Sequence, residues 1–277
     1  MREPDHHSVE VEVAEGDVDV VLDRLWQCHP LAVGEAQTGA GEVRYTAGFA
    51  DAPTARAAME TLAAWQPRLQ AVGRDDWVAT WRRGATPNLA GTFRVRLPEH
   101  TESSDHLDVV IEPGSSFGFG HASTLTALEL LSTIDLAGAS VADVGCGSGV
   151  LAIAACLRGA SRVHAVDIAE EAVTTTVDNA SRNGATVEVA QGSVEALPPG
   201  PFDVVVANLT AGTQQLVLPQ LGERVGRETT IVLSGLLIGQ EAAVESLLHG
   251  QRIVDRRTRD GWIAVRLEST VTASPRP

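Results

Sequence analysis

A glycine-rich turn between two apolar runs is the clearest candidate for a ligand-binding site in this chain. Residues 141–155 read VADVGCGSGVLAIAA, which predicts a strand, a turn and a helix. Gly145, Gly147 and Gly149 allow the backbone to turn sharply and to approach a ligand without a Cβ atom. The start of the following helix offers free backbone N–H groups and a positive dipole end. Turns of this kind bind both nicotinamide dinucleotides and S-adenosyl-L-methionine.

Two features favour S-adenosylmethionine over a nicotinamide cofactor. Asp143 lies two residues before the first glycine, where a carboxylate suits a cationic methionyl group and would repel a pyrophosphate. The glycines follow a G-x-G-x-G spacing rather than G-x-G-x-x-G. Further on, Asp167 ends the run VHAVD and is placed to accept hydrogen bonds from both ribose hydroxyls. The alternative role for Asp167 is to cap the helix predicted at residues 170–182.

Other candidate site residues follow the remaining predicted strands. Ile168 comes directly after Asp167, and Ser193 and Val194 follow the next strand, where we expect contacts with the adenine ring; the alternative is a plain loop. Asn208 ends the run FDVVVAN, at the edge where open parallel sheets carry their chemistry. Its side-chain oxygen can accept a hydrogen bond from an attacking amine, and the alternative is a turn-forming asparagine.

The elements that must position these residues alternate between strand and helix from Ser123 onward, which predicts a parallel α/β sheet. The expected strands are 141–144, 163–168, 187–190, 204–207 and 230–233, with a closing antiparallel hairpin at 253–257 and 262–267. The expected helices are 124–134, 150–158, 170–182, one from Thr213 that Pro219 interrupts, and 241–248. Seven strands ending in a hairpin are typical of the Rossmann-like class I methyltransferase sheet.

The first seventy residues predict a small ferredoxin-like α+β domain, because their pattern is βαββαβ. Its expected strands are 8–13, 31–33, 43–49 and 69–72, with helices near 18–26 and 53–66. A short helix at 75–83 places Trp77 and Trp81 on one face. We therefore expect a domain at 1–73, a linker with this tryptophan helix at 74–106, a methyltransferase domain at 107–270 and a disordered tail at 271–277.

Composition excludes several classes of function. The net charge of −15 argues against a nucleic-acid substrate, and no apolar run reaches the roughly 18 residues of a membrane span. Residues 1–10 lack the pattern of a secretory signal, so we expect a cytoplasmic protein. Three cysteines, Cys28, Cys146 and Cys156, show no metal-binding spacing, and we expect no metal site. Nothing in the sequence pairs Cys146 with a base that would make it a nucleophile.

Taken together, these motifs resemble the ribosomal protein L11 methyltransferase family over nearly the whole chain. The matching segments are PGSSFGFGHAST at 113–124, DVGCGSGVLAIAA at 143–155, AVDI at 165–168, VVVANLTAG at 204–212 and LSG at 233–235. The resemblance implies that Thr124, Gly145, Asp167 and Asn208 contact the cofactor, and we add Phe117 from the same loop as Thr124. It also implies that the N-terminal domain recognises a protein substrate.

The loop before Thr124 departs from the family's pattern. Phe119, Ala122 and Leu125 replace a threonine, a histidine and a threonine of the family. If the Phe119 ring lies beside the transferred methyl group, the enzyme methylates the ribosomal protein poorly and has a different acceptor; the alternative is that the ring points into the core. His121 is a candidate base for an amine nucleophile, or a residue that only starts a helix.

The sequence therefore predicts an S-adenosylmethionine-dependent methyltransferase that modifies nitrogen on a protein or peptide. Two alternatives stay open. The altered loop would also suit a small-molecule, biosynthetic methyltransferase, or a cofactor-binding scaffold without turnover. Neither nucleic acid nor membrane is an expected partner.

Overall fold

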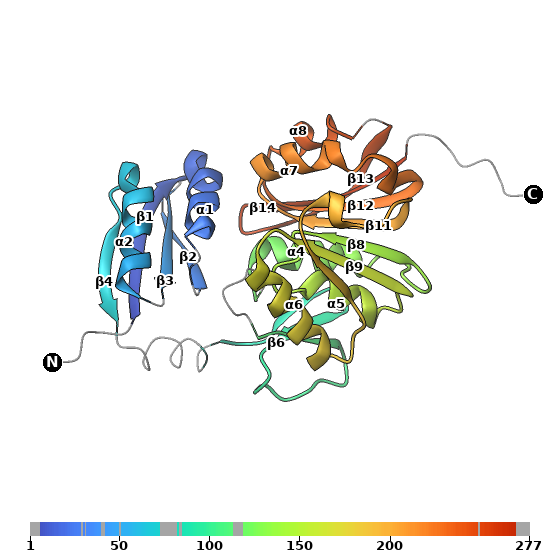
Figure 1. The fold of residues 1–277 in the computed structure, drawn as a ribbon, viewed down its shortest axis with the longest axis horizontal. Coiled ribbons are helices and arrows are strands. Elements are labelled where there is room, and N and C mark those ends of the chain that lie inside the picture. The colour runs from blue at the N-terminus through green and yellow to red at the C-terminus, as the bar shows by residue number, and fades with distance from the viewer. Residues whose placement is uncertain are drawn as a thin grey trace, which may run out of the picture. The chain divides into compact units, whose positions relative to one another are not determined.

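The computed structural model describes residues 6–72 apart from 29, 31, 40–41 and 50, residue 82, and residues 85–112, 119–248 and 250–269. The chain divides into two compact units, one of residues 1–86 and 114–117 and one of residues 87–113 and 118–277 (Figure 1). The predicted tryptophan helix, except Arg82, and the predicted tail lie outside the described residues, as does Phe117.

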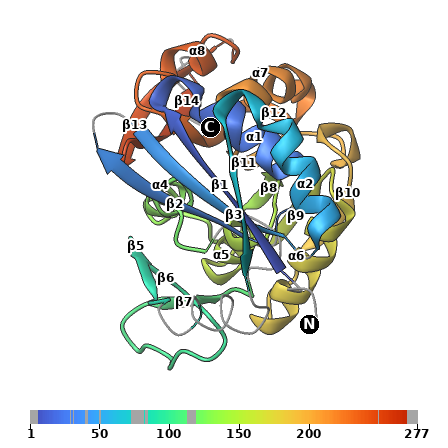
Figure 2. The same cartoon turned by 90° about the vertical axis from the view of Figure 1, so that its left-hand side faces the viewer.

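The first unit has the βαββαβ order that the sequence predicts (Figure 2). Its elements are β1 (His6–Ala14), α1 (Val18–Gln27), β2 (Ala32–Gly39), β3 (Glu42–Phe49), α2 (Ala52–Thr61) and β4 (Arg68–Val72). The sheet order β2-β3-β1-β4, antiparallel throughout, is that of a ferredoxin-like fold. Val9, Val11 and Val13 are buried because alternate residues of a strand share one face.

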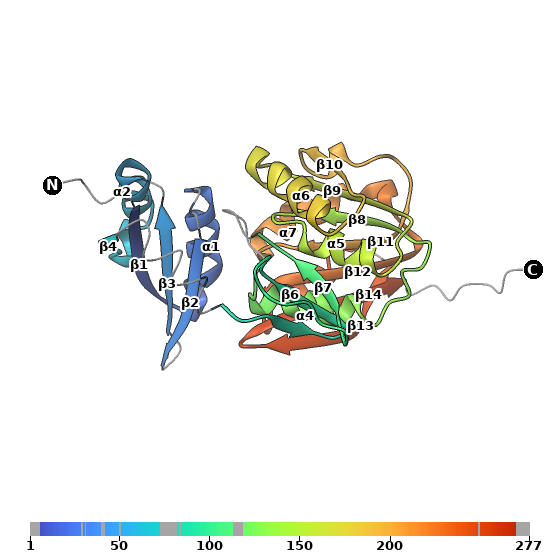
Figure 3. The same cartoon turned by 90° about the horizontal axis from the view of Figure 1, so that it is seen from below.

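The second unit is built on a seven-stranded mixed sheet (Figure 3). Its strands are β8 (Ser140–Val144), β9 (Arg162–Asp167), β10 (Glu188–Gln191), β11 (Phe202–Asn208), β12 (Val225–Leu237), β13 (Gln251–Arg259) and β14 (Trp262–Ser269). They lie in the order β10-β9-β8-β11-β12-β14-β13, with parallel pairing from β10 to β12 and antiparallel pairing of β14 with both β12 and β13. The order reverses between β8 and β11, so the carboxyl ends of these strands form the crevice where such sheets bind ligands. The predicted sheet is confirmed.

Helices follow the strands as expected; α6 has the predicted ends and the others differ at one or both ends. They are α4 (Ala122–Leu131), α5 (Val150–Leu157), α6 (Glu170–Arg182), α7 (Ala211–Val217) and α8 (Glu241–Glu245). Helix α7 ends before Pro219, whose ring cannot continue a helix. Strand β12 is much longer than predicted because Val225–Thr229 and Ser234–Leu237 extend it at both ends. None of the helices in the described part of the chain combines the length and apolar composition that crossing a bilayer requires.

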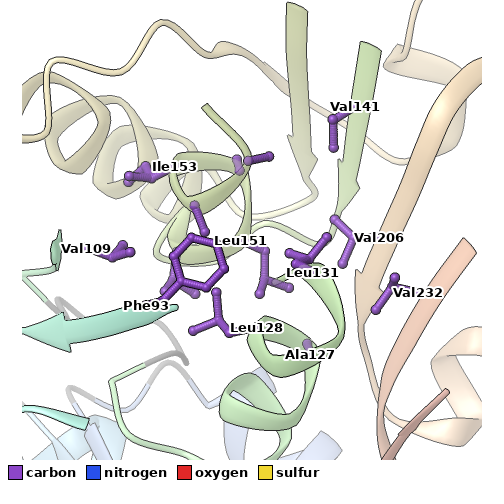
Figure 4. Close-up of a cluster of buried hydrophobic side chains, with 14 of the residues drawn as sticks. Phe93, Val109, Ala127, Leu128, Leu131, Val141, Leu151, Ile153, Val206 and Val232 are labelled. Carbon is purple, nitrogen blue, oxygen red and sulfur yellow. The ribbon is translucent and has the colours of Figure 1, made fainter. Parts of the chain in front are cut away.

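A small three-stranded sheet shows that part of the predicted linker belongs to the second unit. Strands β5 (Asn88–Ala90), β6 (Phe93–Arg96) and β7 (Leu107–Val110) form it, and the sequence analysis missed β5. Phe93 and Val109 pack with Leu128 and Leu151 in one apolar cluster (Figure 4). Burial of the Phe93 ring holds residues 87–106 to the second unit, so this segment is not a linker.

Candidate functional site

The three glycines of the turn after β8 adopt a backbone conformation that other residues rarely reach. The φ angles of Gly145, Gly147 and Gly149 are 75°, 55° and 80°. A Cβ atom on Gly145 would lie 2.4 Å from Leu209 Cδ2, and one on Gly149 would lie 2.8 Å from Thr176 Cγ2. Glycine is therefore required both for the path of the turn and for the close approach of neighbouring elements.

Asp143 lies beneath this turn and is almost wholly buried. Its Oδ2 accepts a hydrogen bond from the Ala152 N–H at 3.0 Å, whereas Oδ1 has no partner among the described residues. Burial raises the pKa of the Asp143 carboxyl to about 7, and the charge of Asp167 adds to this effect. A nearby cation would favour the ionised form, so this carboxyl is suited to a positively charged ligand group.

Asp167, at the end of β9, is fixed by two backbone groups. Its Oδ2 accepts from the Gly147 N–H at 2.9 Å and its Oδ1 from the Ala169 N–H at 3.0 Å. The N-cap position of α6 is Ala169 rather than Asp167, so the helix-cap alternative is wrong. Each carboxylate oxygen keeps a second lone pair for a hydroxyl donor.

Apolar and backbone groups gather beside Asp167. The Ile168 side chain is 76% exposed, which leaves an apolar surface next to the carboxylate. The Gly192 N–H donates to the Asp167 carbonyl at 2.9 Å and brings Ser193 and Val194 to the same edge of the sheet. The Val194 side chain is 1% exposed and packs in the core, so Val194 can offer a ligand only its backbone.

Asn208 and Thr124 are brought together at the end of β11. The Asn208 Nδ2 donates to the Thr124 Oγ1 at 3.0 Å, and Thr124 is fully buried in the first turn of α4. This bond fixes the Asn208 carboxamide and leaves its Oδ1 as the acceptor. Two predicted site residues from distant parts of the sequence therefore form one unit.

His121 occupies the N-cap position of α4. Its Nδ1 accepts the Ser123 N–H at 3.2 Å and lies 2.8 Å from the Ser123 Oγ, and its ring packs edge-on against Trp262 at 4.9 Å between centroids. A neutral ring that accepts at Nδ1 carries its proton on Nε2, so it has no lone pair left for a base. The geometry favours the helix-start role over the catalytic one.

Phe119 is half-buried and packs against the apolar cluster that contains Leu125 and Leu128. This is the alternative stated above, in which the ring points into the core. The steric reason for expecting an acceptor other than the family's is thereby removed.

Three buried residues that the sequence analysis did not single out hold the site together. Asn179 of α6 donates to the carbonyls of Ser148 and Glu112, each at 3.0 Å. Gln214 of α7 donates to the carbonyl directly after β11 and to the Ser234 carbonyl within β12, and the Ser234 Oγ donates to the Ser123 carbonyl at 2.7 Å. Only Ser234, a polar residue in the apolar run IVLSGLL, had a signal in the sequence.

Cys146, inside the glycine turn, is buried. Burial raises the pKa of its thiol, and the thiol accepts a hydrogen bond from the Thr176 hydroxyl at 3.3 Å. A thiol that stays protonated is a poor nucleophile, so Cys146 has a packing role.

Comparison with known proteins decides the family. The sequence profile of ribosomal protein L11 methyltransferase (PrmA) matches residues 36–270. The chain belongs to this family. Among relatives of the same description, the ribosomal protein L11 methyltransferase of Symbiobacterium thermophilum is 32% identical over 72% of this chain and 67% of its own length. The ribosomal protein L11 methyltransferase of Thermus thermophilus is 38% identical over 69% of this chain and 77% of its own length.

A solved structure agrees with this membership. The crystal structure of ribosomal protein L11 methylase from Lactobacillus delbrueckii subsp. bulgaricus superimposes with a TM-score of 0.59 at 28% identity, covering 66% of this chain and 96% of that one. As a member of the ribosomal protein L11 methyltransferase family, the present chain is an enzyme that uses S-adenosylmethionine to transfer methyl groups.

The buried carboxyl of Asp143 predicts a pH dependence. In the free enzyme, burial raises the pKa of the Asp143 carboxyl from 3.8 to about 7. The protonated carboxyl therefore contributes folding stability that is fully present below pH 3.8 and is lost as the pH rises through 7. An Asp143→Asn variant should therefore gain melting temperature relative to the wild type as pH rises from 5 to 8. Its affinity for the cationic cofactor should fall about tenfold at pH 8, or about 1.4 kcal/mol, and less at pH 5.5.

Calorimetric titration at pH 5.5 and pH 8, together with thermal melts between pH 5 and pH 8, tests this expectation. Because the amide oxygen of the Asp143→Asn variant can still accept the Ala152 N–H, the fold should survive. Equal affinity losses at pH 5.5 and pH 8 would show that Asp143 does not titrate in this range.

Proposed function

We propose that this protein methylates nitrogen atoms of ribosomal protein L11, in the cytoplasm, with S-adenosylmethionine as donor. The observation that carries the proposal is the extent of the family match. It begins at residue 36, inside the first unit, and continues to residue 270. A match confined to the glycine turn and its sheet would support methyl transfer alone, whereas this one also includes residues 36–86 of the unit assigned to acceptor recognition.

The residues of the site suit S-adenosylmethionine. A Cβ at Gly145 would displace the Leu209 side chain and strain the backbone, and the Asp143 Oδ1, which has no partner among the described residues, is available to a cationic group. We assign the two ribose hydroxyls to Asp167 and one face of the adenine ring to the exposed Ile168, with the backbone of Ser193 and Val194 at its edge. The bound cofactor supplies an electrophilic methyl group on a sulfonium.

The protein's own part in the transfer is chiefly positional. Methyl transfer to a neutral amine is an in-line displacement, and fixing the two reactants can supply much of the acceleration. We propose that the Asn208 Oδ1 accepts an N–H of the acceptor amine and aims its lone pair at the methyl group. With His121 engaged in capping α4, the amine loses its proton to water rather than to a histidine.

The first unit is assigned to recognition of the acceptor. Residues 1–72 carry twelve acidic side chains against five arginines, and Glu10, Glu12 and Arg44 lie together across β1 and β3. A surplus of negative charge steers basic protein surfaces toward this unit. The charge supports a protein acceptor over a nucleic acid.

Incubation of the purified enzyme with labelled cofactor and purified ribosomal protein L11 tests the proposal. We expect the intact mass of the acceptor to rise by one or more methyl groups. Phe119→Thr restores the family's residue and serves as control. Because the half-buried Phe119 ring packs against the apolar cluster, this variant should lower stability. Its turnover should change less than about threefold, which corresponds to about 0.7 kcal/mol in the activation free energy. Ribosomal protein L11 that carries no label would contradict the proposal. So would label that appears only in small solutes when the enzyme and labelled cofactor are incubated with a cell extract.

A further inference from the structure

The peptide that follows Asn208 is held between two glycines, Gly145 of the turn after β8 and Gly235 within β12. The Leu209 side chain lies against Gly145, whose Cβ would meet Leu209 Cδ2 at 2.4 Å. The Leu209 carbonyl lies against Gly235, whose φ is 82° and whose Cβ would meet that oxygen at 2.4 Å. The Leu209 N–H donates to the Ser234 carbonyl at 3.0 Å. Leu209 thus links the glycine turn to Ser234 and Gly235 of β12.

Gln214 of α7 donates two further hydrogen bonds to the same group of residues. Its side chain is fully buried, and its Nε2 donates to the Leu209 carbonyl and to the Ser234 carbonyl, both at 2.7 Å. Two carbonyl acceptors require two N–H donors on one atom, which a glutamine amide supplies without a charge. The same contacts fix the orientation of the amide, because a reversed amide would direct its oxygen at two carbonyls.

The hydrogen bonds of Gln214 leave its own side-chain oxygen unsatisfied, which bears on the role of this residue. With Nε2 directed at the two carbonyls, Gln214 Oε1 is buried and has no partner among the described residues. An unsatisfied buried acceptor destabilises a fold, so stability alone is a poor reason for a glutamine here. A gain in positional accuracy at the neighbouring Asn208 is a sufficient one.

We propose that Gln214 is a positioning residue for methyl transfer. It binds the peptide after Asn208 to Ser234 of β12 and so fixes the Asn208 carboxamide relative to the glycine turn. The inference rests on the proposed role of Asn208 toward the acceptor amine. It predicts that Gln214 affects turnover more than the binding of either substrate.

Neighbouring glutamines on α7 give a matched test in the full-length enzyme. Gln214→Met keeps the volume and removes both donors, whereas Gln215→Met changes an exposed side chain. We expect Gln214→Met to lower kcat at least tenfold, with the cofactor Kd and the acceptor KM within about threefold of the wild type. Gln215→Met should match the wild type.

A Gln214→Glu variant separates positioning from general damage. Burial keeps its carboxyl neutral, so it can donate one hydrogen bond, and its kcat should fall between those of the wild type and Gln214→Met whatever the order of their melting temperatures. Equal kcat values for Gln214→Met and the wild type would overturn the inference. So would a tenfold loss that appears equally in the cofactor Kd, because Gln214 would then serve cofactor binding.

Hydrogen exchange provides a readout that needs no acceptor. Amides in residues 205–213 should exchange faster in Gln214→Met, because the Leu209 carbonyl loses the hydrogen bond from Gln214. In Gln215→Met the exchange rates should equal those of the wild type. Unchanged exchange in Gln214→Met overturns the inference. A wild-type enzyme that fails to methylate ribosomal protein L11 instead contradicts the proposed function, and the exchange comparison still decides the role of Gln214.

Discussion

Replacing Asp167 with alanine is expected to weaken S-adenosylmethionine binding at least ~30-fold. Two hydrogen bonds from ribose hydroxyls to a carboxylate are charge-assisted, and each contributes roughly 1.5–3 kcal/mol. The carboxylate also holds the Gly147 N–H at 2.9 Å, so its removal loosens the turn that surrounds the cofactor. Calorimetric titration of the folded variant measures the loss directly.

Asp203 provides the control for this prediction. It also lies on a strand of the sheet and accepts two hydrogen bonds, from the N–H and the hydroxyl of Ser140, each at 2.7 Å, but it lies at the amino end of β11, away from the crevice. Asp203→Ala should lower the melting temperature and leave cofactor affinity unchanged. If Asp167→Ala changes affinity less than about threefold, its carboxylate only braces the turn.

Local patterns in the sequence were enough to locate the cofactor turn. Asp143, the three glycines and α5 are consecutive in the chain, so strand, turn and helix could be recognised from composition and spacing alone. The same holds for the parallel α/β sheet and its closing hairpin, because apolar runs alternate with helices from Ser123 onward. Helix α6 was predicted with its observed ends, Glu170 and Arg182.

Features that depend on packing between distant segments could not be predicted in this way. Leu209 lies between Gly145 and Gly235, and no spacing rule relates three residues so far apart in the sequence. The direction of the Phe119 ring depends on how its loop meets the core, which the residue type does not specify. Strand β5 has only three residues, too few for an alternating pattern to stand out.

The role of His121, for which the sequence left two alternatives open, did have a readable signal. His121 is followed two residues later by Ser123, and the structure shows the Ser123 N–H bonded to the histidine ring. A polar side chain that can accept a backbone N–H just before an apolar helical run is typical of an N-cap. Histidine is an uncommon residue there, and its familiar acid–base chemistry kept a catalytic alternative open, whereas the geometry favours the helix-start role.

Removal of the Asn208 side chain is expected to reduce kcat about 100-fold, while the cofactor Kd changes less than about fivefold. A misplacement of about 1 Å between reacting groups can cost this much in rate. In the structure the carboxamide is held by its donor bond to the Thr124 Oγ1 at 3.0 Å, which leaves the oxygen for the acceptor amine. Single-turnover rates with saturating cofactor, compared for the wild type and Asn208→Ala, measure the effect on the transfer step itself.

Thr124→Val tests whether the contact between these residues carries the effect. Valine keeps the buried shape of Thr124 and removes the acceptor for the Asn208 amide, so the carboxamide is no longer fixed. We expect about a tenfold loss in kcat, and we expect the double variant to be no slower than Asn208→Ala, because residues that act as one unit are not additive. Independent losses that multiply in the double variant would separate the two residues. A cofactor Kd that rises in proportion to the loss of kcat would assign Asn208 to cofactor binding instead of acceptor positioning.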